Sequence, residues 1–149
     1  MSNEAPTIIA IDHDDYHAAD VGRTEDGRQF FLTTPFEPRR DDTPGAEFVA
    51  IYVFDGAGKL VEALIDNLGP RATMDSESRR AMCEKRIDDL GPIKRQRIEI
   101  EPFSVTRFDT EFGLIASPPE DEDDIWRVEM QPGNFMAFFE PWDSGEYDT

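Results

Sequence analysis

The segment from Asp12 to His17 (DHDDYH) has the residue types of a metal site. It contains both histidines of the chain, His13 and His17, among carboxylates. Imidazole nitrogens and carboxylate oxygens bind zinc, and side chains four residues apart share one face of a helix. The flanking sequence does not favour a helix, however, and the spacing is the only support for a metal site. We therefore interpret the segment as a polar connection and expect no cofactor.

The sequence offers no setting for nucleophilic catalysis or phosphate binding. Cys83 falls on the apolar stripe of a predicted helix, which predicts a buried and unreactive thiol. No serine lies in a G-x-S-x-G turn, and the glycines of Asp55–Gly58 (DGAG) lie between two predicted strands rather than before a helix. Glu129 and Glu140 lie in apolar strands, but the outward positions of those strands explain them. We assign no catalytic residue.

Basic residues are concentrated in one stretch of the chain. Seven of the fifteen lysines and arginines lie between Arg79 and Arg97. Such a stretch can bind an anion, an acidic partner or RNA, but no aromatic residues alternate with these basic ones. We expect these side chains to pair with carboxylates of the same chain. Arg79, Arg80 and Arg86 remain candidate binding residues.

The overall charge is strongly negative. The chain has 33 Asp and Glu against 15 Lys and Arg, which gives a net charge of −18. A surface of this kind repels the phosphates of nucleic acids, and it favours solubility and basic protein partners. The composition therefore predicts a protein partner, with a basic protein favoured, and no nucleic-acid partner.

The number of cysteines and the hydropathy of the first residues indicate in which cellular compartment the protein is expected. Cys83 is the only cysteine, so no intramolecular disulfide can form and nothing indicates an oxidising compartment. The first residues show no basic segment followed by a long apolar run. We expect a cytoplasmic protein without membrane contact.

The pattern of apolar residues predicts an antiparallel β-sheet. A length of 149 residues with eleven phenylalanines indicates one domain, residues 1–149, with a substantial core. Residues 48–54 (FVAIYVF) are apolar at successive positions, which predicts a strand covered on both faces. Turn residues between apolar stretches predict three hairpins, around Asp26-Gly27, Asp55–Gly58 and Pro132-Gly133. Alternation predicts one half-buried strand over residues 93–108, and residues 109–111 are expected to form the hairpin turn that follows it. The total is six to eight strands.

One helix is predicted over residues 73–90. Thr73 or Asp75 can cap its start, and Gly91-Pro92 ends it. Its narrow apolar stripe predicts that the helix covers a sheet. The stripe consists of Met82, Cys83, Ile87 and Leu90. The expected fold class is α+β, an antiparallel sheet with one helix packed on it. We expect residues 1–6 to be mobile and residues 118–124 to form a solvated, mobile acidic loop.

The C-terminal sequence FEPWDSGEYDT (139–149) carries two aromatic residues, Trp142 and Tyr147. Asp143-Ser144-Gly145 is a strong turn signal, which would fold the last residues back along the preceding strand. Two buried rings would be enough to hold the tail against the body. We favour such a structural clasp over an exposed recognition patch, which is the alternative role for the same two residues.

Four segments of the sequence resemble a known family. VGRTEDGRQFF (21–31), FDGAGKL (54–60), FGLI (112–115) and PWDSGEYDT (141–149) together resemble bacterial formate hydrogenlyase regulatory (HycA-like) proteins. The family pattern is similar to G-R-x-x-D-G-x-Q-F-F with a final P-P-W-x-x-x-Y-D-T, and Glu140 stands here in place of the first proline. The resemblance implies a repressor that acts by protein contact, and it transfers no catalytic residue.

These observations leave three hypotheses for function. The first is a non-enzymatic cytosolic protein that acts through protein contacts, with a regulatory role as one form. The second is an acidic immunity protein that neutralises a basic toxin enzyme, since opposite charges speed association. The third is a small-molecule-binding or hydrolytic domain with a phenylalanine-lined cleft. We favour the first and expect no enzymatic activity.

Overall fold

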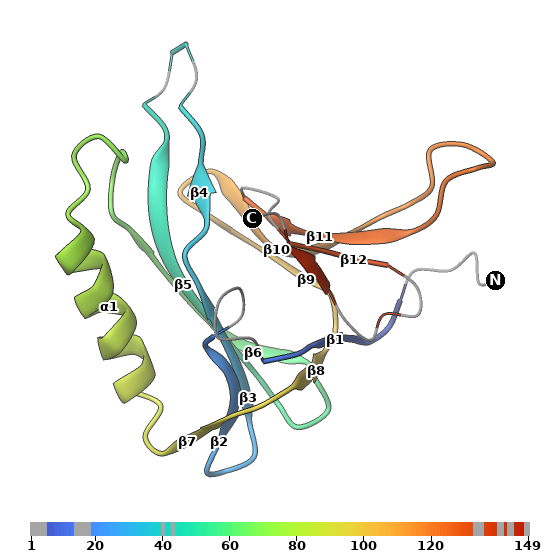
Figure 1. The fold of residues 1–149 in the computed structure, drawn as a ribbon, viewed down its shortest axis with the longest axis horizontal. Helices are drawn as coiled ribbons and strands as arrows, with labels where there is room; N and C mark the ends of the chain where they lie inside the picture. The colour runs from blue at the N-terminus through green and yellow to red at the C-terminus, as the bar shows by residue number, and fades with distance from the viewer. Residues whose placement is uncertain are drawn as a thin grey trace.

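The computed structural model describes residues 6–13, 19–39, 41–42, 44–132, 136–139, 142 and 145–147. Within these residues the chain forms thirteen strands in three antiparallel sheets, together with one helix (Figure 1). The predicted α+β class, mainly antiparallel with one helix, is confirmed. The expected single sheet of six to eight strands is wrong, because several short strands form where the sequence shows only loops or one longer strand.

The largest sheet is built around β5 (Ala46–Phe54). Every residue from Glu47 to Phe54 is buried, which confirms that both faces of this strand are covered. β3 and the short β4 pair with one edge of β5, and β6 pairs with the other. The remaining strands of this sheet are β7 (Ile93–Arg95), β2 (Val21–Thr24), β3 (Gln29–Thr33), β4 (Phe36–Glu37) and β6 (Leu60–Asn67).

Helix α1 (Ser76–Asp88) covers one face of this sheet (Figure 1). Asp75 caps its start, since the Asp75 carboxylate accepts a hydrogen bond of 3.1 Å from the Glu77 N–H. The predicted stripe packs as expected: Met82, Cys83, Ile87 and Leu90 contact a cluster formed by Leu32, Val49 and Ile51. No residue of the helix is fully buried, so the helix is a cover and not part of the central core.

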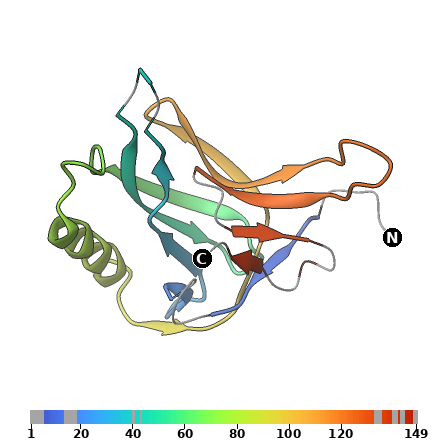
Figure 2. The same ribbon diagram turned by 45° about the horizontal axis from the view of Figure 1, so that its top comes forward.

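A second sheet has five strands, in the order β13–β12–β11–β10–β9. It confirms two of the predicted hairpins, β9–β10 and β11–β12. The third sheet is the short pair of β1 and β8, which lies where the two larger sheets approach each other (Figure 2). These strands are β9 (Phe103–Arg107), β10 (Thr110–Ser117), β11 (Arg127–Gln131), β12 (Met136–Phe138), β13 (Gly145–Tyr147), β1 (Ile9–Ile11) and β8 (Ile98–Ile100).

All three sheets contribute to one apolar core. The inner face of β5 presents Phe48, Tyr52 and Phe54, each at most 1% exposed. Their rings meet Phe112 and Phe103 of the second sheet edge-on, with ring centroids 4.6–5.3 Å apart. Such pairs each add about 1 kcal/mol to the free energy gained by burying their area.

Residues 93–107 do not form the single strand that alternation predicts. They form β7, β8 and β9, and each of these strands belongs to a different sheet (Figure 2). The breaks are stabilised by hydrogen bonds to other parts of the chain. The Gln96 N–H donates to the carbonyl of Val21 at 3.1 Å, and the Glu101 N–H donates to that of Gly58 at 2.8 Å. Pro102 lies between β8 and β9. We call residues 93–107 the crossing segment.

Three glycines let the crossing segment approach closely. A Cβ at Gly22 would overlap the carbonyl of Lys94 in β7, and a Cβ at Gly113 would overlap the carbonyl of Phe103 in β9. At Gly58 it would lie 2.7 Å from the carbonyl oxygen of Glu99 in β8. Each strand of the crossing segment therefore packs against backbone at a position that has room only for hydrogen.

The side chain of Gln29 fastens β3 to β8. It is completely buried, and its amide group makes three hydrogen bonds. Nε2 donates to the carbonyls of Asp55 and Glu99 at 3.2 and 2.9 Å, and Oε1 accepts from the Glu99 N–H at 2.8 Å. This one side chain joins the largest sheet, the β5–β6 turn and the crossing segment.

The tail forms the clasp that the sequence predicts at Trp142. This residue is partly buried and packs against the central core. Its N–H donates to the carbonyl of Phe139 at 2.7 Å, and its carbonyl accepts from the Ala10 N–H at 2.9 Å. β13 then pairs with β12, with Tyr147 opposite Met136. The Tyr147 side chain lies outside the described part of the structure, so its role stays a prediction.

The acidic loop 118–124 joins β10 to β11, and most of its residues are exposed, as expected. The Glu120 N–H donates to the Asp124 carboxylate at 3.0 Å, and the Asp123 N–H donates to Asp121 at 3.0 Å. Backbone N–H groups therefore lower the pKa of Asp124. The mobility of this loop stays a prediction, and of residues 1–6 only Pro6 lies in the described part.

The described part of the chain contains no helix of the length and apolar character needed to span a bilayer.

Candidate functional site

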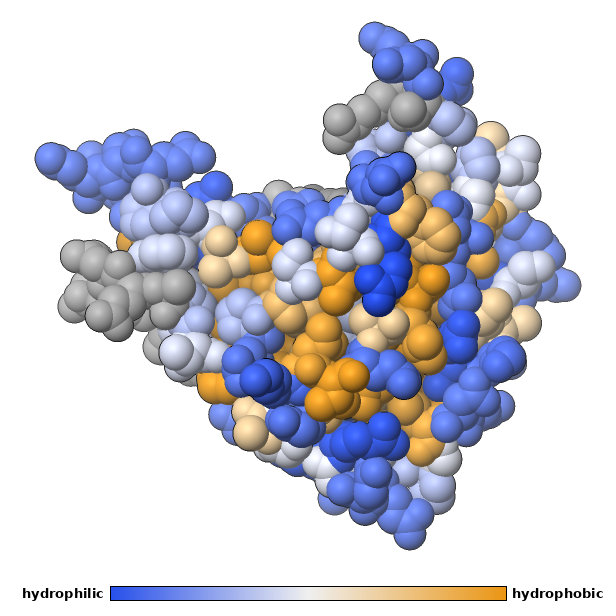
Figure 3. Space-filling model, turned by 180° about the vertical axis from the view of Figure 1, so that it is seen from behind, coloured by the Kyte–Doolittle hydropathy of each residue, from blue (hydrophilic) through white to orange (hydrophobic). Residues whose placement is uncertain are grey.

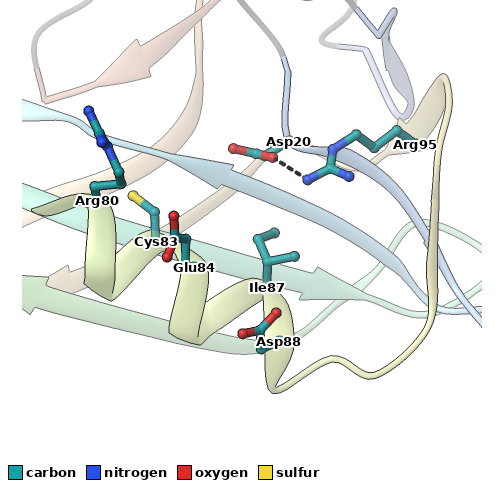
Figure 4. A pocket seen from close by; sticks show the side chains of 7 residues that line it. All are labelled: Asp20, Arg80, Cys83, Glu84, Ile87, Asp88 and Arg95. Carbon is teal, nitrogen blue, oxygen red and sulfur yellow. Dashed lines mark hydrogen bonds and ion pairs between the residues drawn. The ribbon is translucent and has the colours of Figure 1, made fainter.

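A cavity of about 460 Å³ lies between α1 and the start of β2 (Figure 4). One wall is the helix, and the other is formed by the residues beside β2 and β7. An ion pair of 3.1 Å joins Asp20 and Arg95 on the side opposite the helix. The lining residues are Asp20, Arg80, Cys83, Glu84, Ile87, Asp88 and Arg95.

The lining of this cavity carries both signs of charge. The Arg80 guanidinium has no ion pair with any described residue, whereas Arg95 is paired with Asp20. Glu84 and Asp88 add two carboxylates on the helix side (Figure 4). No histidine is among the described residues that line the cavity, so these residues supply no imidazole as general base for the thiol of Cys83. The described lining thus offers two guanidinium and three carboxylate groups, to which the polar groups of another molecule could bind.

Cys83 differs in part from its prediction. The sequence predicts a buried thiol, but the side chain is half-buried at the edge of this cavity. Burial raises the pKa of the Cys83 thiol most, the carboxylates of Asp20 and Glu84 raise it further, and the Arg79 guanidinium opposes them in part. A thiol with a raised pKa is protonated near neutral pH and is a weak nucleophile. The environment therefore works against a catalytic role.

The prediction that the basic stretch pairs with the chain's own carboxylates is confirmed for four of its seven residues. Four of its seven cations form ion pairs, at distances of 2.7–3.1 Å. Among the described residues, Arg79, Arg80 and Lys94 form no ion pair. The four pairs are Lys85–Asp89, Arg86–Asp66, Arg95–Asp20 and Arg97–Asp12.

Arg86 connects the helix to the sheet. Its guanidinium donates two hydrogen bonds to Asp66 of β6, from Nε at 3.0 Å and from Nη2 at 2.9 Å. The two side chains are only 19% and 21% exposed, and the hydrogen bonds to Asp66 raise the pKa of Arg86. The Arg86 guanidinium, a candidate binding group in the sequence analysis, is therefore already engaged by Asp66.

Substituting Arg86 by methionine tests this structural role. We expect a loss of about 1–2 kcal/mol in the free energy of unfolding, since a part-buried, bidentate ion pair is removed. The control is Lys85→Met, at the residue before Arg86, which removes the exposed ion pair between Lys85 and Asp89. This variant should lose no more than about 0.5 kcal/mol of unfolding free energy. Chemical denaturation of both variants measures the difference. Equal effects would show that the Arg86–Asp66 contact does not stabilise the helix on the sheet.

The candidate metal ligands are not brought together in the described residues. His13 is half-buried and engaged with another group, and His17 lies outside the described part. The described residues contain no cluster of three or more His, Cys, Asp or Glu side chains arranged to hold a metal ion. Of the two carboxylates singled out for acid–base chemistry, Glu129 pairs with Arg127 at 2.8 Å, and Glu140 lies outside the described part.

Sequence reasoning misses a second cavity, of about 430 Å³, beside the β9–β10 turn. Phe108 lies at its rim and is 54% exposed. Both central residues of the turn, Phe108 and Asp109, have positive φ angles, 53° and 58°. The sequence predicts a turn here, but a phenylalanine suggests a core position. The sequence signal that could have indicated an exposed Phe108 is its position directly before Asp109, the first residue of the predicted turn.

No family model matches the sequence, and the comparisons with curated proteins and with solved structures also give no match.

Proposed function

We propose that this protein works by binding another protein, one with a basic surface, and that it does so without catalysis. A regulatory role, as the family resemblance implies, and the neutralisation of a basic toxin enzyme are two forms of the same activity. In either form, the carboxylate-rich surface would attract a positively charged partner.

The charge balance is the observation that carries this proposal. Fifteen cations serve 33 carboxylates, so one-to-one pairing within the chain leaves a surplus of 18 carboxylates. Seven of the fourteen described cations form ion pairs within the chain, and Arg127 alone lies within 4.0 Å of three carboxylates. A basic partner offers the cations that this surface lacks.

The shape of the surface also supports a protein partner. On the face shown in Figure 3, apolar side chains gather in the middle of the molecule, where β6 and β9 lie, and hydrophilic projections rise beside them. Val61 of β6 is 56% exposed, and Leu60 and Val105 are partly exposed beside the core. An apolar centre with a charged rim is the usual composition of a protein–protein interface.

A capture experiment tests the proposal. The tagged protein, incubated with native lysate at low ionic strength, is expected to retain a basic protein in near-stoichiometric amount. Because the attraction is electrostatic, raising the salt to about 0.5 M should release most of it. The purified pair should then show a dissociation constant that rises with salt.

An unrelated acidic globular protein of similar net charge is the control for this capture. Proteins retained equally by both baits are bound by charge alone and would contradict a specific partner. Recovery of an acidic protein, or of nothing at any salt concentration, would also contradict the proposal.

A further inference from the structure

The cavity beside the β9–β10 turn combines aromatic rings with carboxylates. Phe48 forms part of its floor, and Phe108 lies at its rim with Asp109 beside it. Glu37 of β4 contributes the second carboxylate. Neither lysine nor arginine is among the described lining residues, which also include Pro44, Gly45, Ala46, Asn67 and Thr110.

The backbone keeps Phe108 at the surface. Its φ of 53° is a conformation that bulky residues rarely adopt and that costs free energy. The ring lies against the buried Phe48, with centroids 6.1 Å apart and planes 24° apart, and still leaves half of the side chain exposed. An exposed ring held in a strained turn, beside two carboxylates, is a feature that core packing alone does not require.

The protein itself shows what such a combination binds. On the adjacent residue of β4, the Phe36 ring has the guanidinium of Arg71 above it, with Cζ 5.5 Å from the ring centroid. The same guanidinium pairs with the buried carboxylate of Glu47 at 2.7 Å. One ring and one carboxylate thus hold one arginine on the opposite face of β4, and in the cavity Phe108, Glu37 and Asp109 offer the same groups.

We propose that this cavity receives an arginine side chain of the basic partner. The guanidinium would lie against the Phe108 ring and pair with Glu37 or Asp109. Arginine fits better than lysine, because its flat guanidinium stacks on rings and binds carboxylates through two hydrogen bonds at once. This inference rests on the proposed function, and it names the contact by which this protein would select an arginine-bearing partner.

Peptide binding tests the inference without knowledge of the partner. The probes are GSGRRRGSG and its counterpart GSGKKKGSG, titrated into the full chain at low ionic strength with calorimetric and NMR detection. The arginine peptide is expected to bind about five-fold more tightly than the lysine peptide and to shift the ring resonances of Phe108. Phe108→Leu and Glu37→Gln/Asp109→Asn should each weaken arginine-peptide binding about ten-fold, whereas Phe108→Tyr keeps the ring and should preserve it.

The matched control is Glu120→Gln/Asp123→Asn, which removes the same charge from the acidic loop and should change affinity less than about two-fold. Equal weakening by the two double variants, or unmoved Phe108 resonances, would overturn the cavity as the arginine site and leave the basic-partner proposal standing. Failure of both peptides to bind would overturn the cavity as well, and the capture experiment then decides the proposed function separately.

Discussion

Replacing Gly113 by alanine is expected to lower the free energy of unfolding by about 3 kcal/mol or more. Two effects add at this position. Gly113 has a φ of +142°, which residues with a Cβ rarely adopt. The new methyl group would also overlap the carbonyl of Phe103 in the neighbouring strand β9, and backbone on both sides leaves little room to relax. Urea denaturation of the variant measures the loss.

Gly27→Ala is the matched control for this prediction. Gly27 also has a positive φ, +87°, but a Cβ there would meet no atom within 4 Å. This variant should therefore show the conformational cost alone, about 1 kcal/mol. If both variants lose the same free energy, the close approach of β9 to Gly113 contributes nothing.

Substituting Gln29 by alanine is expected to cost about 3 kcal/mol. The change deletes all three hydrogen bonds of the buried amide group and leaves the N–H of Glu99 without its acceptor. A cavity remains where the side chain was completely buried. We expect a lower midpoint of unfolding in both heat and urea.

The control for Gln29 is Gln96→Ala, which lies in the crossing segment between β7 and β8. Only the backbone of Gln96, and not its side chain, has a hydrogen bond among the described residues. Its replacement should change stability by no more than about 0.5 kcal/mol. A loss at Gln29 as small as that at Gln96 would show that the three hydrogen bonds are exchanged for water at no cost.

Local elements of the fold are predictable from the sequence. β5 is predicted because seven successive residues, 48–54, are apolar, and the hairpin of β2 and β3 follows from Asp26-Gly27, where Gly27 has the positive φ that the turn requires. The helix is predicted equally well from its cap, its stripe and its terminal Gly91-Pro92. In each of these cases the information lies within about twenty residues of sequence.

The division into three sheets is not predictable in this way. Ile98 and Ile100 alternate with Glu99 as in any half-buried strand, and nothing near them shows that their partner is Ile9–Ile11 at the other end of the chain. The places where strands approach closely depend on distant glycines. Gly22, Gly58 and Gly113 lie in the motifs that carry the family resemblance, so these motifs have structural roles in this chain.

For the candidate site, the sequence predicts the sign of the charge but not the positions of the side chains. The excess of carboxylates and the internal pairing of the basic stretch both follow from composition. The bidentate contact of Arg86 with Asp66 depends on where the helix crosses β6, which no local pattern specifies. The exposure of Phe108 depends on a turn geometry that phenylalanine does not favour.

The crossing segment has a consequence for the order of events during synthesis. β1 leaves the ribosome early, yet its pairing partner β8 follows only after most of the chain has been made. Closing so long a loop is entropically costly and slow. β1 therefore has no strand partner until residues 98–100 have been made, and the strands of the five-stranded sheet follow still later. A nascent chain that ends before residue 103 lacks the whole sheet that covers the inner face of β5.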